Sequence, residues 1–108
     1  MNNKSKAIDF PKVVLFDWDR GNLTKSKRKH KIEPVESEQV FTNNPVYFYD
    51  ERHSQAEDRY FAYGITNTGR RLFVAFTIRY NKVRIISARG QNKKERVIYE
   101  KAQKNTAV

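Results

Sequence analysis

The second half of the chain alternates apolar and polar side chains with the period of two that is typical of β-strands. The clearest case is residues 71–80, where Leu72, Val74 and Phe76 would share one face of a strand. Similar runs are separated by short polar turns, such as the one at residues 67–69. The pattern predicts an antiparallel meander of four strands, at residues 46–50, 59–66, 71–80 and 83–88.

The first half of the chain predicts one strand followed by two short helices. The run VVLFDW, residues 13–18, is apolar and rich in β-formers, which predicts a strand. Glu33-Pro34 predicts the start of the second helix, because proline is well placed in a first turn. The first helix would run through about His30, and its candidate caps are Asp17, Asp19 and Asn22.

A third helix is predicted at the C-terminal end. Asn92 and Glu95 have the spacing of a capping box, and the helix would run to about Lys104. The order β-α-α-β-β-β-β-α is typical of an α+β fold, with helices packed on one side of an antiparallel sheet. The predicted organisation is a flexible arm at residues 1–12, a single domain at 13–104 and a tail at 105–108.

Composition narrows the class of protein. The chain has 108 residues, the size of one domain, and its 38% hydrophobic content is too high for a disordered chain. The absence of cysteine excludes disulfides and thiolate metal sites. The N-terminal segment lacks the apolar core of a signal peptide, and no run approaches the ~20 apolar residues of a membrane helix. We therefore expect a cytoplasmic protein that does not contact a membrane.

The net charge of +10 is unevenly distributed. Residues 1–32 hold nine Lys/Arg against three acids, and residues 70–108 hold eleven against two, whereas residues 33–58 hold seven acids and one arginine. This segregation favours a positive face that binds polyphosphates or an acidic protein, and a merely solubilising surface is the alternative. In the runs KSKRKHK and NKKER, the candidates for holding an RNA backbone are Lys29, Lys93 and Lys94.

The segment DERHSQAEDRYFAYG contains acid/base candidates. His53 and Glu57 are side chains that can transfer protons, and Arg59 supplies a cation nearby on a predicted strand. The alternative is structural, with Ser54 capping a turn and Glu57 paired to an arginine.

Two arginines lie in and beside an apolar strand, Arg84 and Arg89. Strand alternation would place Arg84 on one face with Ile86 and Ala88. A guanidinium on a rigid strand can hold a phosphate with two N–H donors. Cleavage of RNA by its own 2′-hydroxyl needs a base, an acid and such cations, and no metal is obligatory. The alternative is that these arginines bridge to Glu57 or to Glu95 and tie the sheet to the last helix.

Sequence motifs for cofactors are absent. Neither of the standard glycine-rich nucleotide loops occurs, and the two histidines lack a paired metal-ligand spacing. Asp17 and Asp19 could share a metal ion, but helix capping explains them better. We therefore expect no cofactor and no metal site.

Several of these motifs, in this order, resemble the BrnT toxin family. They are FDWD, Asn22 with Lys29-His30 after it, the Phe41 helix end, RHSQAEDRYFAYG and RIISARGQNKKERVIYE, and they cover about residues 14–100. The resemblance implies a RelE-like fold and a ribonuclease toxin of a type II toxin–antitoxin pair. It also implies a hetero-oligomer with a BrnA-like antitoxin, through which alone the toxin would reach operator DNA.

The resemblance also implies site residues. The family's positions fall on His53, Ser54, Glu57, Arg59 and Arg89, and the helix pair on Glu95-Arg96. Gly90 departs from the family, where a bulkier residue is expected before the helix, and the leading arm is longer than expected.

We therefore expect a metal-independent endoribonuclease with catalytic His53, Glu57, Arg59 and Arg89, and with Lys29, Arg84, Lys93 and Lys94 binding RNA. The alternatives are a non-catalytic module that binds RNA or the ribosome, and a co-repressor subunit that acts through its protein partner.

Overall fold

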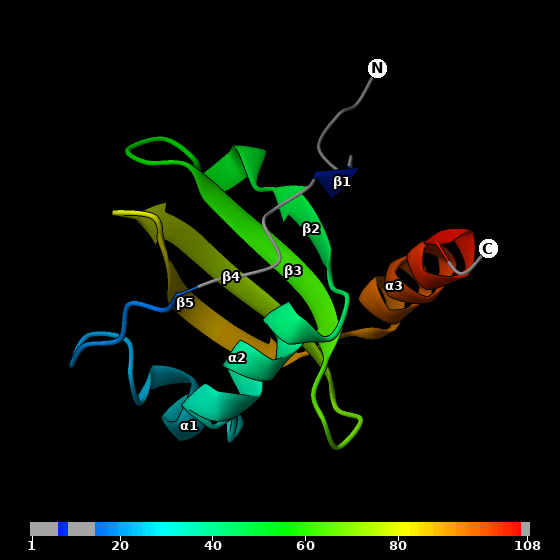
Figure 1. Ribbon diagram of the computed structural model, residues 1–108, viewed down its shortest axis with the longest axis horizontal. Helices are drawn as coiled ribbons and strands as arrows, with labels where there is room; N and C mark the ends of the chain where they lie inside the picture. Colours follow the sequence, from blue (N-terminus) through cyan, green and yellow to red (C-terminus); the bar gives the residue numbers. More distant parts are fainter. Residues whose placement is uncertain (1–6, 9–14, 107–108) are drawn as a thin grey trace.

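The computed structural model describes residues 7–8 and 15–106. It has an α+β fold with the predicted order of elements (Figure 1). The elements are β1 (Ala7–Ile8), α1 (Lys25–His30), α2 (Pro34–Thr42), β2 (Val46–Tyr49), the 3₁₀-helix η1 (Glu51–His53), β3 (Arg59–Ile65), β4 (Arg71–Arg79), β5 (Lys82–Gly90) and α3 (Lys93–Thr106). None of the described helices is long and apolar enough to cross a membrane.

The sheet is an antiparallel meander in the order β1-β2-β3-β4-β5. The predicted turn before β4 is confirmed, with Gly69 at a φ of 93°. The tight connection predicted at 81–82 lies one residue earlier, because Tyr80 and Asn81 have φ values of 53° and 63°. Two consecutive positive φ values are typical of the type I′ turns that match the twist of a hairpin.

The strand predicted at residues 13–18 is wrong for residues 15–18. Residues 13–14 lie outside the described residues, and from 15 to 18 only Phe16 pairs, in a single parallel bridge with Val83. The first strand is instead Ala7–Ile8, which pairs with β2. The rest of the predicted arm, and residues 107–108 of the predicted tail, lie outside the described residues.

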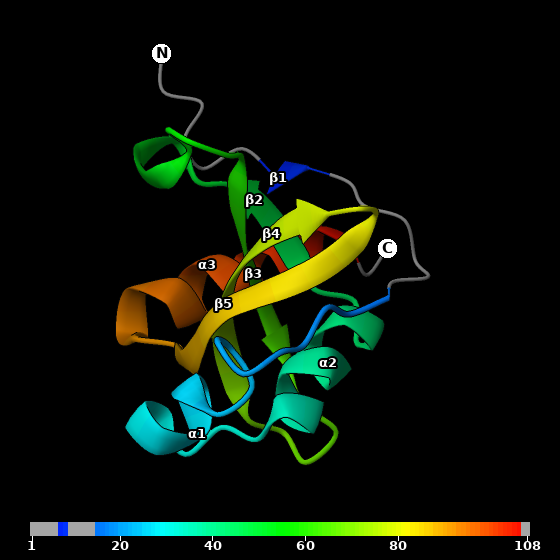
Figure 2. The ribbon, with the colours of Figure 1, turned by 90° about the vertical axis from the view of Figure 1, so that its left-hand side faces the viewer.

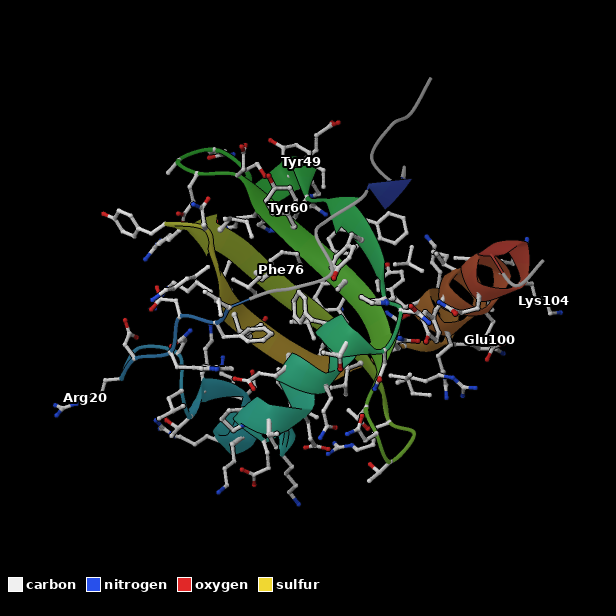
Figure 3. The ribbon with its side chains drawn as sticks, in the orientation of Figure 1. Arg20, Tyr49, Tyr60, Phe76, Glu100 and Lys104 are labelled. Atoms are coloured by element: carbon white, nitrogen blue, oxygen red, sulfur yellow. The ribbon has the colours of Figure 1, made fainter. Side chains whose placement is uncertain are left out.

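The helices cover both faces of the sheet, so the prediction that they lie on one side is wrong (Figure 2). On one face, α2 contributes Val40 and Phe41 to a buried cluster with Val74 and Phe76. On the other face, Tyr99 of α3 packs with the residues Phe48 and Tyr63. Figure 3 shows Tyr49, Tyr60 and Phe76 along the sheet. The rings of Tyr60 and Phe76 are stacked, with their centroids 5.6 Å apart. A sheet that is covered on both faces needs apolar side chains at successive positions.

Residues 15–26 cover the outer edge of β5. An uncovered edge strand would leave backbone donors and acceptors unpaired. Here four hydrogen bonds satisfy them: Val83 N to Leu15 O (2.7 Å), Asp17 N to Val83 O (2.8 Å), Asn22 Nδ2 to Ile85 O (2.9 Å) and Ala88 N to Ser26 Oγ (2.7 Å).

These contacts correct the predicted start of the first helix. Helix α1 begins at Lys25, and its N-cap Thr24 makes no side-chain capping bond. The predicted caps belong to the preceding loop, where the Oδ1 atom of buried Asn22 accepts the N–H of Asp19 at 2.8 Å. By contrast, both other helix starts are confirmed, with capping boxes at Glu33/Glu36 and Asn92/Glu95.

Gly64 is expected to be intolerant of any side chain, because α2 packs directly on it. A Cβ at Gly64 would lie 2.5 Å from Val40 Cγ1, whereas one at Gly90 would meet only Arg71 O at 4.0 Å. We expect Gly64→Ala to lower the free energy of unfolding by about 1–3 kcal/mol, and Gly90→Ala to leave it unchanged or slightly raised. Urea denaturation measures both, and equal stabilities of the two variants would contradict this packing.

Candidate active site

A cleft of about 180 Å³ lies where the loop before α1 meets the ends of β3, β4 and β5. It is smaller than the 300–1,000 Å³ typical of pockets for whole ligands, and so suits a single group such as a phosphodiester. Four cations and one carboxylate line it: Lys25, Arg59, Arg79, Arg84 and Glu57. The rest of the lining is Gly21, Asn22, Thr77, Ile85 and Ile86.

The register of β5 against β4 shifts by one residue in the middle of the strand. Phe76 is opposite Ile85, but its neighbour Ala75 is opposite Ser87, so Ile86 is an extra residue in a β-bulge. A bulge reverses the alternation of faces beyond it.

The bulge places Arg84 and Arg89 on one face, although an odd number of positions separates them. Arg84 is opposite Thr77 and Arg89 is opposite Phe73, and these two β4 residues share a face. The prediction that Arg84 shares a face with Ala88 is wrong, because the bulge lies between them.

Arg84 is held by two aspartates of the loop before α1. Its Nη1 and Nη2 atoms each lie 2.9 Å from a carboxylate oxygen of Asp19, and Nη1 is 3.6 Å from Asp17. The Arg84 guanidinium, followed by the amide of Gly21, lowers the pKa of the Asp19 carboxyl. The two aspartates therefore bind Arg84 and do not cap α1. In the described part of the chain, no group of three or more metal-ligating side chains occurs.

Glu57 is the carboxylate of the cleft. Arg79 donates to it through Nε (3.2 Å) and Nη2 (3.0 Å), so the predicted alternative of an arginine partner is confirmed. This hydrogen bond lowers the pKa of Glu57, and the charges of Arg59 and Arg84 lower it further. Glu57 is therefore ionised at neutral pH, which is the form that a general base needs, although a lowered pKa weakens the base.

Arg59 projects from a fixed backbone. Its N–H donates to Ser54 Oγ at 2.8 Å, and Ser54 Oγ in turn donates to Asp50 O at 2.6 Å. Ser54 thus closes the loop onto the start of β3 rather than binding Glu57. Among the described residues, no carboxylate pairs with the guanidinium of Arg59, which leaves its charge available in the cleft.

His53 lies outside the cleft, on η1. Its Nδ1 is 2.8 Å from Asp50 Oδ2, and its side chain is 61% exposed. The structure therefore brings Glu57, Arg59 and Arg84 together but does not place His53 beside them.

Arg89 also lies outside the cleft. It forms a bidentate pair with Glu95 (2.8 and 2.9 Å), and its guanidinium carbon is 4.1 Å from the centre of the Phe73 ring. The predicted alternative that an arginine ties the sheet to the last helix is thus confirmed. Because Phe73 and Thr77 are four residues apart on β4, Arg89 is displaced from Arg84 by about 13 Å along the sheet.

The predicted RNA-binding lysines are exposed and do not line the cleft: Lys29 on α1, and Lys93 and Lys94 at the start of α3.

Two cleft residues were not predicted. Arg79 had a signal, since the period of two places it on the same face as Thr77 and thus beside Arg59. Lys25 also had a signal, because it is the first residue of the basic run KSKRKHK, from which only Lys29 was named as a candidate.

The arrangement suits chemistry at a phosphate. Cations from three strands and one helix surround a small space, and an ionised carboxylate lies among them. Tyr47 and Tyr63 do not line the cleft, and burial raises the pKa of both to about 12.

Comparison with known proteins gives one family. The model of the ribonuclease toxin BrnT, of type II toxin–antitoxin systems, matches residues 18–95, which include every residue of the cleft. No curated protein matches the chain.

The Arg89–Glu95 pair is expected to make stability depend on pH. Burial raises the pKa of Glu95, but the hydrogen bonds from Arg89 and from the Asn92 amide outweigh it, and the net pKa lies below 4.5. Ionised Glu95 therefore stabilises the fold above about pH 4.5, and this contribution is lost as the pH falls through the lower folded pKa.

We expect Glu95→Gln to lower the free energy of unfolding at pH 7 by about 1.5–3 kcal/mol and to flatten its dependence on acidic pH. Denaturation followed by Trp18 fluorescence from pH 7 down to about pH 3 measures both effects. Glu100→Gln is the matched control, because the Glu100–Arg71 pair is exposed, with a separation of 3.4 Å. An unchanged pH dependence in Glu95→Gln would contradict the assignment.

Proposed function

The chain belongs to the BrnT family of ribonuclease toxins from type II toxin–antitoxin systems, and we propose that it is an endoribonuclease that cleaves RNA without a metal ion. The family implies an RNA substrate and an antitoxin protein as partner. The observation that carries the proposal is the cleft, where Arg59, Arg79 and Arg84 surround Glu57.

The proposed reaction is transfer of a phosphodiester within the RNA strand. The 2′-oxygen attacks the adjacent phosphorus, its proton passes to a base, and the bond to the 5′-oxygen breaks as that oxygen gains a proton. The products are a 2′,3′-cyclic phosphate and a 5′-hydroxyl. A positioned base or acid contributes typically ~10²–10⁴-fold.

Glu57 is the proposed base, because it is ionised and lies in the cleft. His53 is the proposed acid, although it would have to approach from the loop that precedes β3. Arg59 and Arg84 are the proposed cations at the phosphorane. Arginine has five N–H donors, so Arg84 keeps donors for a phosphate while two of them hold Asp19.

Arg89 receives a different role from the one the sequence suggested. Its pairing with Glu95 and its displacement along the sheet favour a positioning role, in which it fixes α3 against β4 and β5. Arg59 and Arg84 then replace it as the groups that contact the scissile phosphate.

The proposal predicts RNA cleavage by the purified toxin in EDTA. Arg84→Ala, Arg59→Ala and Glu57→Gln should each lower kcat by about 10²–10³-fold, because each removes a preorganised group from the reacting phosphate. Arg71→Ala is the control, since Arg71 does not line the cleft and its partner among the described residues is exposed Glu100. Cleavage is measured on a labelled oligoribonucleotide, and intact RNA in EDTA with cleavage restored by Mg²⁺ would exclude a metal-independent reaction.

We propose that the partner is a BrnA-like antitoxin, which carries the DNA-binding part and neutralises the toxin in a hetero-oligomer. Expression of the chain alone should arrest growth, and co-expression with the product of the adjacent reading frame should restore growth and give a complex that co-purifies. Arg84→Ala should lose toxicity but still bind the partner. A stable complex without toxicity of the free chain would favour a co-repressor, and toxicity without RNA cleavage would favour a non-catalytic RNA-binding or ribosome-binding module.

A further inference from the structure

A second, larger groove lies beside the candidate active site, on α1. We infer that this groove binds the backbone phosphates of the RNA strand that flank the cleaved bond, an inference that rests on the proposed ribonuclease function. It extends the substrate from a single phosphodiester in the cleft to a strand of several nucleotides.

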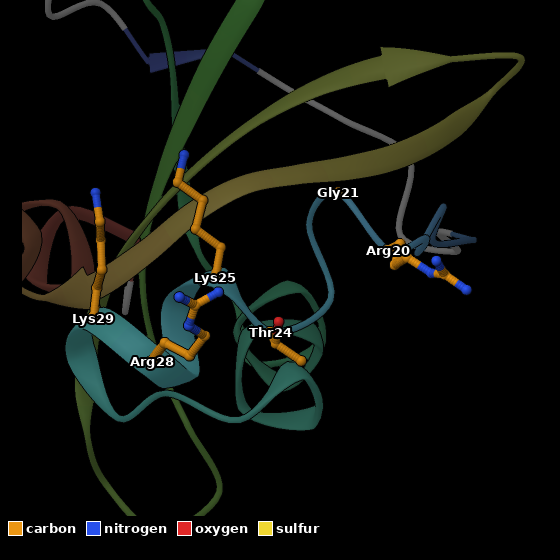
Figure 4. Close-up of a pocket in the computed structure, with 6 residues that line it drawn as sticks. All are labelled: Arg20, Gly21, Thr24, Lys25, Arg28 and Lys29. Atoms are coloured by element: carbon orange, nitrogen blue, oxygen red, sulfur yellow. The ribbon is translucent and has the colours of Figure 1, made fainter.

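The groove has a volume of about 400 Å³ and a lining without any acidic side chain. Its lining residues are Arg20, Gly21, Thr24, Lys25, Arg28 and Lys29. Figure 4 shows Lys25 and Lys29 extending in the same direction toward β5, with Arg28 between them, whereas the Arg20 side chain points away. The α1 side chains therefore form the groove's basic wall.

The α1 cations of this groove differ in their partners from several arginines elsewhere in the chain. Arg70, Arg79, Arg84 and Arg89 each have a carboxylate within 3.0 Å. In the part of the chain that the structure describes, no carboxylate pairs with Lys25, Arg28 or Lys29. Their charges are therefore free to bind an external anion.

The three side chains share one face of α1, because their positions are i, i+3 and i+4. Like charges at these spacings destabilise a helix by about 0.2–0.5 kcal/mol per pair. The next residue after Lys25 on α1 is buried Ser26, whose Oγ accepts the N–H of Ala88 and so anchors the helix to β5. The basic face is thus held in place despite its repulsion, which a bound polyanion would relieve.

The groove is continuous with the candidate active site. Gly21 and Lys25 line both the groove and the cleft. A strand with one phosphate beside Arg59 and Arg84 can therefore place neighbouring phosphates along Lys25, Arg28 and Lys29. Lys25 lies at the junction, between the scissile phosphate and the next one.

The groove should bind RNA regardless of its base sequence. No aromatic side chain lines it, so it offers no platform for base stacking. Lysine and arginine contacts to phosphate supply affinity that depends on salt but carry no sequence information. The number of flanking nucleotides should then decide affinity, and the cleft alone would act on the scissile bond.

The test compares two double variants that remove the same charge. Arg28→Gln with Lys29→Gln changes the groove, and Lys101→Gln with Lys104→Gln changes two exposed cations of α3. The probe is a fluorescein-labelled 2′-O-methyl oligoribonucleotide of about 12 nucleotides, within the usual single-strand site sizes. It cannot be cleaved, because its 2′-oxygens are methylated. Anisotropy titrations at several salt concentrations give log K against log salt.

The slope of log K against log salt should become shallower by about 0.7 for each lost phosphate contact. Relative to the wild type, the slope should therefore fall by about 1.4 in the groove variant and stay unchanged in the α3 variant. In cleavage assays the groove variant should raise KM for a long RNA several-fold with kcat unchanged, and leave cleavage of a dinucleotide unaltered. Equal slopes for the two double variants would overturn the groove as an RNA site. Because the probe reports binding alone, a wild type that binds but cleaves nothing would contradict the proposed function without contradicting the groove.

Discussion

The outer edge of β5 must be covered, since backbone groups at an open strand edge pair with other chains. Residues 15–26 meet this need with two backbone bonds to Val83 and with the side chains of Asn22 and Ser26. The same bonds hold the loop and α1 against β5, and residues of the loop and α1 line both the cleft and the basic groove. The protection of the sheet and the construction of the candidate site are therefore one set of interactions.

The β-bulge in β5 distributes the two arginines of that strand. By reversing the alternation, it turns both Arg84 and Arg89 to the face on which α3 packs. Arg84 then meets the loop before α1, and Arg89 meets Glu95 at the start of α3. One irregularity thus gives the strand a cation at the cleft and a brace for the last helix, while Ile85 and Ala88 stay in the core.

Sequence reasoning found the elements that depend on local chemistry. The β2–β5 meander, the capping box at Asn92 and Glu95, and the start of α2 all follow from nearby residues. It failed where distant contacts decide: the bulge is invisible in the alternation of RIISAR, and the aspartates of FDWD bind Arg84 instead of capping a helix. The second covered face had a signal, because YFAYG is apolar at successive positions and so belongs to a strand buried on both sides. Of the candidate site, Glu57, Arg59 and Arg84 were found by residue type, but their grouping needed the fold.

The pairing of the site's arginines explains how a chain of net charge +10 can hold cations close together before any substrate arrives. Asp19 and Glu57 orient Arg84 and Arg79, so the side-chain entropy of about 2 kcal/mol each is lost on folding and not on binding RNA. The carboxylates also weaken attraction for a phosphodiester, which carries one negative charge. The phosphorane of the proposed reaction carries more, and Arg59 and Lys25, without carboxylate partners in the described residues, supply the excess positive charge. Such a cleft favours the transition state over the substrate, which is the condition for raising kcat and not merely affinity.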